Sequence, residues 1–211
     1  MAATVGRGRF DVRRHVRDAR TSRTRASAQG WWKEWEGTWK GWQDVSRAKK
    51  KKRELLQLIQ GTNRGLVQDR KEEIRRCAME LGDLAKGSTN TAEEVLSAKW
   101  KLLWTTEKET LFIFEKFASA GEAYQVIDVQ EATLQNIIEF PPDGAFTVDS
   151  KITITSPTRV DFRFEAARIQ TKFGSIPLPP FGKGWFENIY VDDTLRLSSD
   201  SRGDLLIVER N

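Results

Sequence analysis

The sequence predicts a mainly β protein in which a helical part precedes a closed antiparallel β-barrel. Three observations support this class. Residues 46–86 carry apolar side chains at helical spacing. After the Gly/Ser/Thr-rich stretch 87–90, apolar and polar residues alternate in short segments, as they do in strands. Gly, Pro and Ser turns separate these segments at intervals typical of a small barrel.

Residues 1–28 are predicted to be a transit peptide. Residues 1–26 contain eight arginines, no lysine and two acidic residues, a composition typical of organelle targeting. The alternative is a disordered basic tail that the mature protein keeps. The chain has a net charge of +5, but without residues 1–26 it has 27 basic and 28 acidic residues. Nucleic acid is therefore not an expected partner.

Residues 29–48 form a tryptophan-rich segment. Their 3-4-3 spacing would place four tryptophans on one face of a helix, namely Trp32, Trp35, Trp39 and Trp42. Such a face suits the boundary of a lipid layer, where an indole ring is buried and its N–H stays hydrated. A contact with a protein partner and packing against the rest of the chain are the alternatives.

Residues 49–90 are predicted to be a helical lead-in. The basic run Lys49–Arg53 opens a helix, glycines at 61 and 65 end it, and a second helix covers about 68–84. The only cysteine, Cys77, is expected to be a small apolar residue of that second helix.

Residues 91–211 are predicted to form the barrel. In the segments 151–155 and 159–165 apolar and polar residues alternate cleanly, so the apolar side chains share one face and line the interior. The expected strands are Trp100–Thr105, Thr110–Phe117, Ala123–Asp128, Thr133–Phe140, Ala145–Val148, Lys151–Ser156, Arg159–Glu165, Asn188–Val191, Thr194–Ser198 and Asp204–Glu209.

The chain lacks the residues that most classes of catalytic site require. The only histidine is His15, inside the predicted transit peptide, so nucleophile systems that need an imidazole and the usual zinc sites cannot be assembled. We expect no catalytic residue, no metal and no cofactor. No apolar run reaches the roughly 18 residues needed to cross a bilayer, so we expect a soluble or peripheral protein.

An apolar interior favours the binding of a hydrophobic small molecule, and ordinary core packing is the alternative. The candidate lumen residues are Trp100, Leu102, Phe112, Phe114, Tyr124, Ile152, Ile154, Phe162 and Phe164. The Pro-rich loop 173–185 is a candidate lid or lipid contact, with a structural plug as the alternative. Its apolar residues are Phe173, Ile176, Leu178, Phe181 and Trp185.

Asp192 and Asp193 are adjacent on an expected strand, so their side chains point to opposite faces and cannot form a catalytic dyad. We expect one of them to support a turn and the other to contact Arg196 or Arg202.

Three segments in the same order resemble the plastid lipid-associated proteins, the fibrillins. They are Leu55–Gly65, Lys99–Thr106 and the carboxyl-terminal stretch with the signature residues Tyr190, Asp192, Asp193, Arg196, Arg202 and Gly203. The resemblance covers residues 50–209. It implies a lipocalin-like antiparallel β-barrel preceded by two or three helices.

The resemblance also implies a plastid location, at plastoglobules or thylakoids. There the protein would bind or partition lipids, carotenoids or prenylquinones without enzyme activity, as a peripheral protein of lipid droplets or thylakoids. The alternative is a non-catalytic adaptor that docks on a plastid lipid or prenylquinone biosynthetic enzyme through the tryptophan-rich segment. An enzyme that acts on a lipid is a third option, which the lack of histidine disfavours.

Overall fold

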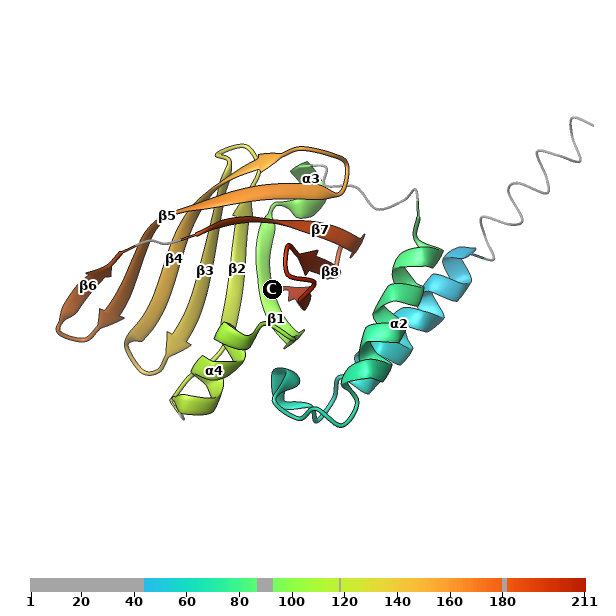
Figure 1. Cartoon of the computed structure of the whole chain (residues 1–211), viewed down its shortest axis with the longest axis horizontal. Helices are drawn as coiled ribbons and strands as arrows, with labels where there is room; N and C mark the ends of the chain where they lie inside the picture. Colours follow the sequence, from blue (N-terminus) through green and yellow to red (C-terminus); the bar gives the residue numbers. More distant parts are fainter. Residues whose placement is uncertain (1–43, 87–92, 118, 180–181) are drawn as a thin grey trace, which may run out of the picture. The chain divides into compact units, whose positions relative to one another are not determined.

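The computed structural model describes residues 44–86, 93–117, 119–179 and 182–211 (Figure 1). The predicted transit peptide and the four tryptophans at positions 32–42 lie outside these residues. Within the described part, contacts group residues 47–211 into one unit. No helix in these ranges is long and apolar enough to cross a membrane.

Helices come first along the chain, as the sequence predicts. Residues 44–58 are helical. Three further helices follow, namely the 3-10 helix η1 (Asn63–Gly65), the α-helix α2 (Lys71–Leu84) and the short helix α3 (Glu93–Leu96). In α2 the apolar residues repeat every three to four positions, so one face is buried and the charged residues stay outside. Gly82 lies on the buried face, where a Cβ would come within 2.3 Å of the Ile189 side chain.

Nine antiparallel strands in the described residues make up one sheet that closes in a ring. The strands are β1 (Ala98–Thr105), β2 (Ala123–Asp128), β3 (Thr133–Phe140), β4 (Gly144–Ile154), β5 (Arg159–Thr171), β6 (Gly174–Leu178), β7 (Lys183–Val191), β8 (Leu195–Asp200) and β9 (Leu205–Arg210). Their order is β4-β3-β2-β1-β9-β8-β7-β5, and β4 also pairs with β5, which closes the circle. The short strand β6 pairs only with β5 and extends from the ring as a hairpin (Figure 1).

The buried apolar residues form two clusters on opposite faces of the sheet. The inner cluster lies inside the ring and includes Trp100, Ile127 and Val160. The outer cluster joins the helices to β1, β8 and β9 through residues such as Leu55, Leu81 and Leu197. Alternation along β8 explains the division, because Leu195 and Leu197 face the helices while Arg196 and Ser198 face the interior.

The strand predicted over residues 110–117 is wrong. This segment is helix α4 (Lys108–Lys116), which follows β1 and lies by one end of the strands (Figure 1). Its β-branched and aromatic residues favour a strand locally, but the packing of the helix on the ring outweighs this preference. Phe114 packs in the inner cluster, whereas Phe112, two residues earlier, is exposed. The two strands predicted at 145–148 and 151–156 are one strand, β4. Its register with β5 shifts after Asp149, where Glu165 of β5 is the extra residue of a bulge.

Candidate ligand-binding site

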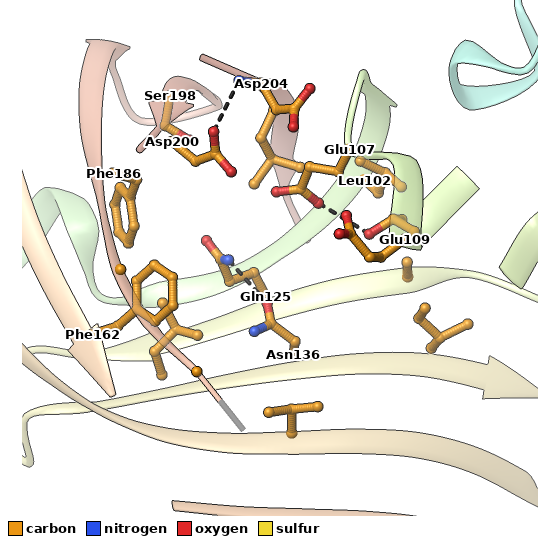
Figure 2. Close-up of a pocket in the computed structure, with 18 of the residues that line it drawn as sticks. Leu102, Glu107, Glu109, Gln125, Asn136, Phe162, Phe186, Ser198, Asp200 and Asp204 are labelled. Carbon is orange, nitrogen blue, oxygen red and sulfur yellow. Dashed lines mark hydrogen bonds between the residues drawn. The ribbon is translucent and has the colours of Figure 1, made fainter. Parts of the chain in front are cut away.

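A cavity of about 540 Å³ lies inside the ring, at the end that α4 covers (Figure 2). Its walls are mainly apolar and come from all the strands of the ring and from α4. The apolar lining residues include Leu102, Ile113, Ala123, Leu134, Ile138, Phe146, Val148, Phe162, Phe164, Phe186, Leu206 and Val208. Several of these residues also belong to the inner cluster, whose fully buried Trp100 does not line the cavity.

The structure divides the nine candidate lumen residues among three environments. Four of them line the cavity, namely Leu102, Tyr124, Phe162 and Phe164. Trp100, Phe114 and Ile152 are buried in the inner cluster. Phe112 on α4 is 54% exposed and Ile154 at the end of β4 is 37% exposed, so these two face solvent.

A chain of polar side chains crosses the interior at the base of the cavity. Arg196 on β8 donates a hydrogen bond from Nη2 to Oε1 of Gln125 on β2, although β9 and β1 separate these strands in the ring. Gln125 in turn donates from Nε2 to Oδ1 of Asn136 on β3, at 3.0 Å. Gln125, Asn136 and Ser198 line the cavity, and Figure 2 shows the Gln125–Asn136 bond. We call Gln125, Asn136 and Ser198 the polar floor; Arg196 lies behind it.

Arg196 is fully buried and its charge is only partly accommodated. The guanidinium carbon lies 5.4 Å from the Trp100 ring centre and 5.3 Å from that of Phe186. Its Nε and Nη1 atoms have no hydrogen-bond partner, and none of the described carboxylates forms an ion pair with it. Burial lowers the pKa of Arg196 to about 9, against the nearby charge of Glu107, which raises it, so Arg196 stays charged at neutral pH.

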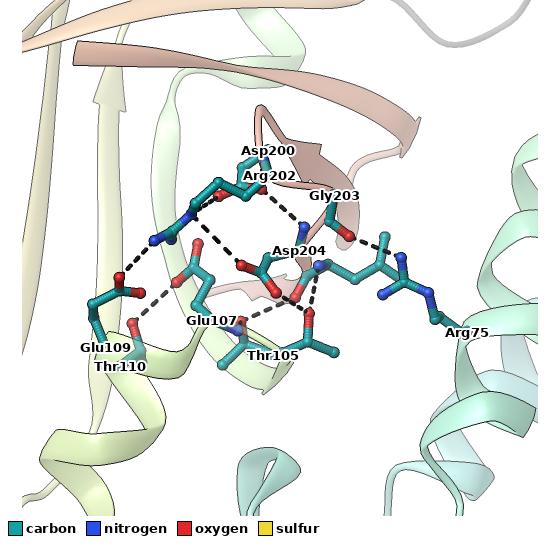
Figure 3. A network of polar contacts seen from close by, with 11 residues as sticks. Arg75, Thr105, Glu107, Glu109, Thr110, Asp200, Arg202, Gly203 and Asp204 are labelled. Atoms are coloured by element: carbon teal, nitrogen blue, oxygen red, sulfur yellow. Dashed lines mark hydrogen bonds and ion pairs between the residues drawn. The ribbon is translucent and has the colours of Figure 1, made fainter. Parts of the chain in front are cut away.

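The mouth of the cavity carries acidic residues held by one network (Figure 3). Arg202, in the β8–β9 turn, pairs with Glu109 of α4 and with Asp200, and lies 3.6 Å from Asp204. Thr106 donates to Asp204 at 2.8 Å. The network therefore fixes the start of α4 to the β8–β9 turn beside the cavity.

Among the carboxyl groups at the mouth, Glu107 has a pKa that is strongly raised. It lines the cavity just before α4 and accepts a hydrogen bond from Thr110 at 3.0 Å. Burial, helped by the nearby negative charges of Asp200 and Asp204, raises the pKa of Glu107 to about 7, against the Thr110 bond and Arg202, which lower it. Protonation of this carboxyl therefore changes near neutral pH.

The other signature residues support the fold. Asp192 accepts hydrogen bonds from the Tyr190 hydroxyl and from the backbone N–H groups of Thr194 and Leu195. Asp192 is thus the aspartate that supports the turn, and it also pairs with Lys52 of the first helix at 2.5 Å. The predicted contact of the other aspartate with Arg196 or Arg202 is wrong, because Asp193 is exposed and Arg210 donates to its carbonyl. Burial raises the pKa of Asp192, but the bonds from Lys52 and Tyr190 outweigh it and lower the value to about 2.

Replacing Asp192 by Asn should cost about 1 kcal/mol of stability at pH 7, a figure reduced because the pair is partly exposed. The ionised carboxylate stabilises the fold above its ordinary pKa of 3.8, and this contribution is lost as the pH falls towards 2. Urea unfolding at several pH values should therefore show a deficit at pH 7 that shrinks below about pH 4. Asp193→Asn is the matched control, since Asp193 is exposed and Arg210 contacts only its carbonyl. A deficit of equal size in both variants would contradict the assignment.

The predicted loop 173–185 is largely strand. Gly174–Leu178 forms β6, whose Pro177 sits on an edge strand where its missing N–H costs no ladder bond. Phe173 at the β5–β6 turn is 89% exposed and Ile176 is 56% exposed, while Leu178 is half-buried. Trp185 is on β7 under the guanidinium of Arg159, and Phe181 lies outside the described residues.

Comparisons with known proteins fit this architecture. The family model described as PAP_fibrillin matches residues 49–209. The chain therefore belongs to the fibrillin family. A probable plastid-lipid-associated protein 11 of Arabidopsis thaliana is 50% identical over 171 residues, which cover 77% of this chain and 80% of that protein. No solved structure matches.

Two further fibrillin relatives widen the comparison. Plastid-lipid-associated protein 6 of Arabidopsis thaliana is 27% identical, over 74% of this chain and 68% of that protein. A chromoplast-specific carotenoid-associated protein of Cucumis sativus is 30% identical, over 61% of this chain and 42% of that protein. The names of these relatives place them in chloroplasts or chromoplasts, and this fibrillin is a plastid protein.

The sequence did not single out the polar residues of this fibrillin's cavity. Gln125, Asn136 and Glu107 were not candidates, and Arg196 was expected, as an alternative to Arg202, to contact Asp192 or Asp193. One signal was present, because Arg196 alternates with Leu195 and Leu197 on a strand whose apolar residues face outwards to the helices.

Proposed function

We propose that this fibrillin binds a hydrophobic small molecule, such as a lipid, carotenoid or prenylquinone, inside a lipocalin-like barrel. The cavity of about 540 Å³ carries this proposal, because its volume falls in the usual range of roughly 300–1,000 Å³ for small-molecule sites. Eight strands that each neighbour the next along the chain, with a hairpin inserted, are also the arrangement of up-and-down barrels that hold one ligand. The name of the cucumber relative, a carotenoid-associated protein, agrees with such a ligand.

We further propose that the β5–β6 hairpin contacts the surface of plastoglobules or thylakoids. Phe173 and Ile176 expose apolar side chains at its tip, and the cation of Lys172 lies 4.8 Å from the Phe173 ring centre. An apolar group beside a cation suits the boundary of an anionic lipid layer. A groove of about 580 Å³ beside the hairpin, lined by residues such as Phe117, Phe140 and Ile169, continues this apolar surface.

The domain boundaries at residues 28, 48 and 90 are part of the proposal, with residues 1–28 as the transit peptide. We propose no catalytic role for the cavity, and turnover of an added lipid by the purified protein would overturn that statement. The adaptor alternative depends on the tryptophan-rich segment, and capture of a plastid lipid or prenylquinone enzyme by a lipid-free protein would favour it.

Replacing Val148 by Trp should at least halve the amount of hydrophobic molecule recovered by solvent extraction of the purified protein. Val148 lines the cavity, so an indole there occupies the space that the ligand needs. Mass spectrometry of the extract measures the ratio of ligand to protein. Thr153→Trp is the matched control, because Thr153 lies exposed on the same strand next to the inward-facing Ile152. Equal recovery from both variants would contradict binding in the cavity.

A further inference from the structure

The polar floor has a fixed hydrogen-bond polarity. A guanidinium can only donate, so Arg196 requires the Oε1 atom of Gln125 as acceptor. Gln125 must then present its Nε2 group to the next residue, and it donates to Oδ1 of Asn136. Nδ2 of Asn136 is therefore the last group of this hydrogen-bonded series. It has two N–H donors and no acceptor among the described side chains. The floor therefore offers donors to whatever enters the cavity.

The charges along the cavity also favour an acceptor at the floor, because positive charge lies behind the floor and negative charge lies at the mouth. The buried cation of Arg196 lies behind the floor, with Nε and Nη1 unpartnered. Four carboxyl groups line the mouth, namely Glu107, Glu109, Asp200 and Asp204, against two cations, Arg202 and Lys183. An anionic group is attracted towards the floor and repelled at the mouth, so a bound amphipathic anion would lie with its charged end at the floor.

We propose that the cavity binds an apolar molecule that ends in a carboxylate, and that the carboxylate accepts hydrogen bonds from Asn136 on the polar floor with Arg196 behind it. This proposal rests on the proposed function and names the ligand class of the same cavity. A neutral alcohol or alkane would leave Arg196 with no ion-pair partner and only the partly protonated Glu107 carboxyl as a counter-charge, whereas a carboxylate at the floor supplies a full one. The apolar walls formed by residues such as Phe162, Phe186 and Val208 would surround the hydrocarbon chain.

Binding to the lipid-free full-length chain tests the proposal. The probes are palmitate, methyl palmitate and hexadecanol, each measured by equilibrium dialysis at low ionic strength and neutral pH. Palmitate should bind at least about tenfold more tightly than either neutral probe, because a hydrogen bond to a charged group contributes about that factor. With carbon-13 at its carboxyl carbon, bound palmitate should stay ionised to a lower pH than free palmitate.

Asn136→Asp replaces the outer donor of the floor by an acceptor of the same shape. The new carboxylate can still accept the bond from Gln125, so the fold should be kept, as circular dichroism would verify. The preference for palmitate should disappear, and the carbon-13 titration of bound palmitate should shift to higher pH. Gln57→Glu is the matched control, since it adds the same charge at an exposed position on the first helix. Asn136→Leu, which removes the donor without adding charge, serves if the first variant does not fold.

The outcomes separate this inference from the proposed function. Equal binding of the three probes, or a palmitate preference that Asn136→Asp leaves intact, would overturn the carboxylate assignment while a cavity ligand remained. The second result would place the anion elsewhere, for instance on the amino-terminal arginines. Failure of all three probes to bind the parent chain would count against the cavity as a ligand site altogether.

Discussion

An Arg196→Met variant should be more stable than the parent protein and yet lose its preference for palmitate. The parent buries a cation that lacks a carboxylate partner, and replacing buried charges by apolar residues of similar size often stabilises a fold by about 1–4 kcal/mol. Loss of the bond to Gln125 offsets about 1 kcal/mol of this gain. We therefore expect a net gain of about 1–3 kcal/mol in the ligand-free protein, or several degrees in melting temperature.

Thermal unfolding of the ligand-free proteins and the palmitate dialysis measure the two effects. Arg163→Met is the control, because Arg163 is an exposed arginine on β5 whose removal should change stability by less than about 0.5 kcal/mol. If the buried cation lowers stability but directs ligand binding, Arg196→Met should raise the melting temperature and at the same time weaken the binding of palmitate. If Arg196→Met lowers stability instead, Arg196 serves the fold. If the variant keeps the preference for palmitate, the role of Arg196 in binding is refuted.

The order of helices and strands followed from the sequence because the period of the apolar residues changes once, near residue 90. The strands predicted at 123–128 and 133–140 have the bounds of β2 and β3. The segment 110–117 could not be assigned this way, since its dense apolar run has no clear period. Its position between β1 and β2 over the end of the ring, which makes it helical, depends on contacts with distant parts of the chain.

The apolar wall of the candidate site was predictable and the polar floor was not. Alternation along β5 placed Phe162 and Phe164 inside, where both line the cavity. The bond between Arg196 and Gln125 joins residues 71 positions apart across the interior, and nothing in the local sequence of either strand indicates the other. The expectation that Arg196 contacts a neighbouring aspartate rested on short sequence distance, whereas the closure of the ring decides which side chains meet.

The Glu107 carboxyl makes the stability of the protein depend on pH near neutrality. Its pKa in the fold is about 7, above the ordinary value of 4.5, so the folded protein holds a proton that the unfolded chain releases between these values. Stability from this group is fully present below about pH 4.5 and is lost as the pH rises to 7. At about 1.4 kcal/mol per pKa unit, a rise from 4.5 to about 7 corresponds to at most about 3.5 kcal/mol, and partial exposure of the side chain reduces the expected loss above pH 7 to about 2–3 kcal/mol.

Glu107→Gln removes this dependence, because the amide stays neutral at every pH and can still accept the bond from Thr110. The variant and the parent should have equal stability in urea unfolding at pH 4.5, and the variant should be more stable by about 2–3 kcal/mol at pH 8. Glu109→Gln is the comparison, since the Arg202 bond lowers the pKa of Glu109 and its ionisation stabilises the fold. That variant should lose stability at pH 8 rather than gain it. A pH-independent difference between Glu107→Gln and the parent would show that the fold does not raise the pKa of Glu107 and that the mouth of the cavity is better hydrated than its walls indicate.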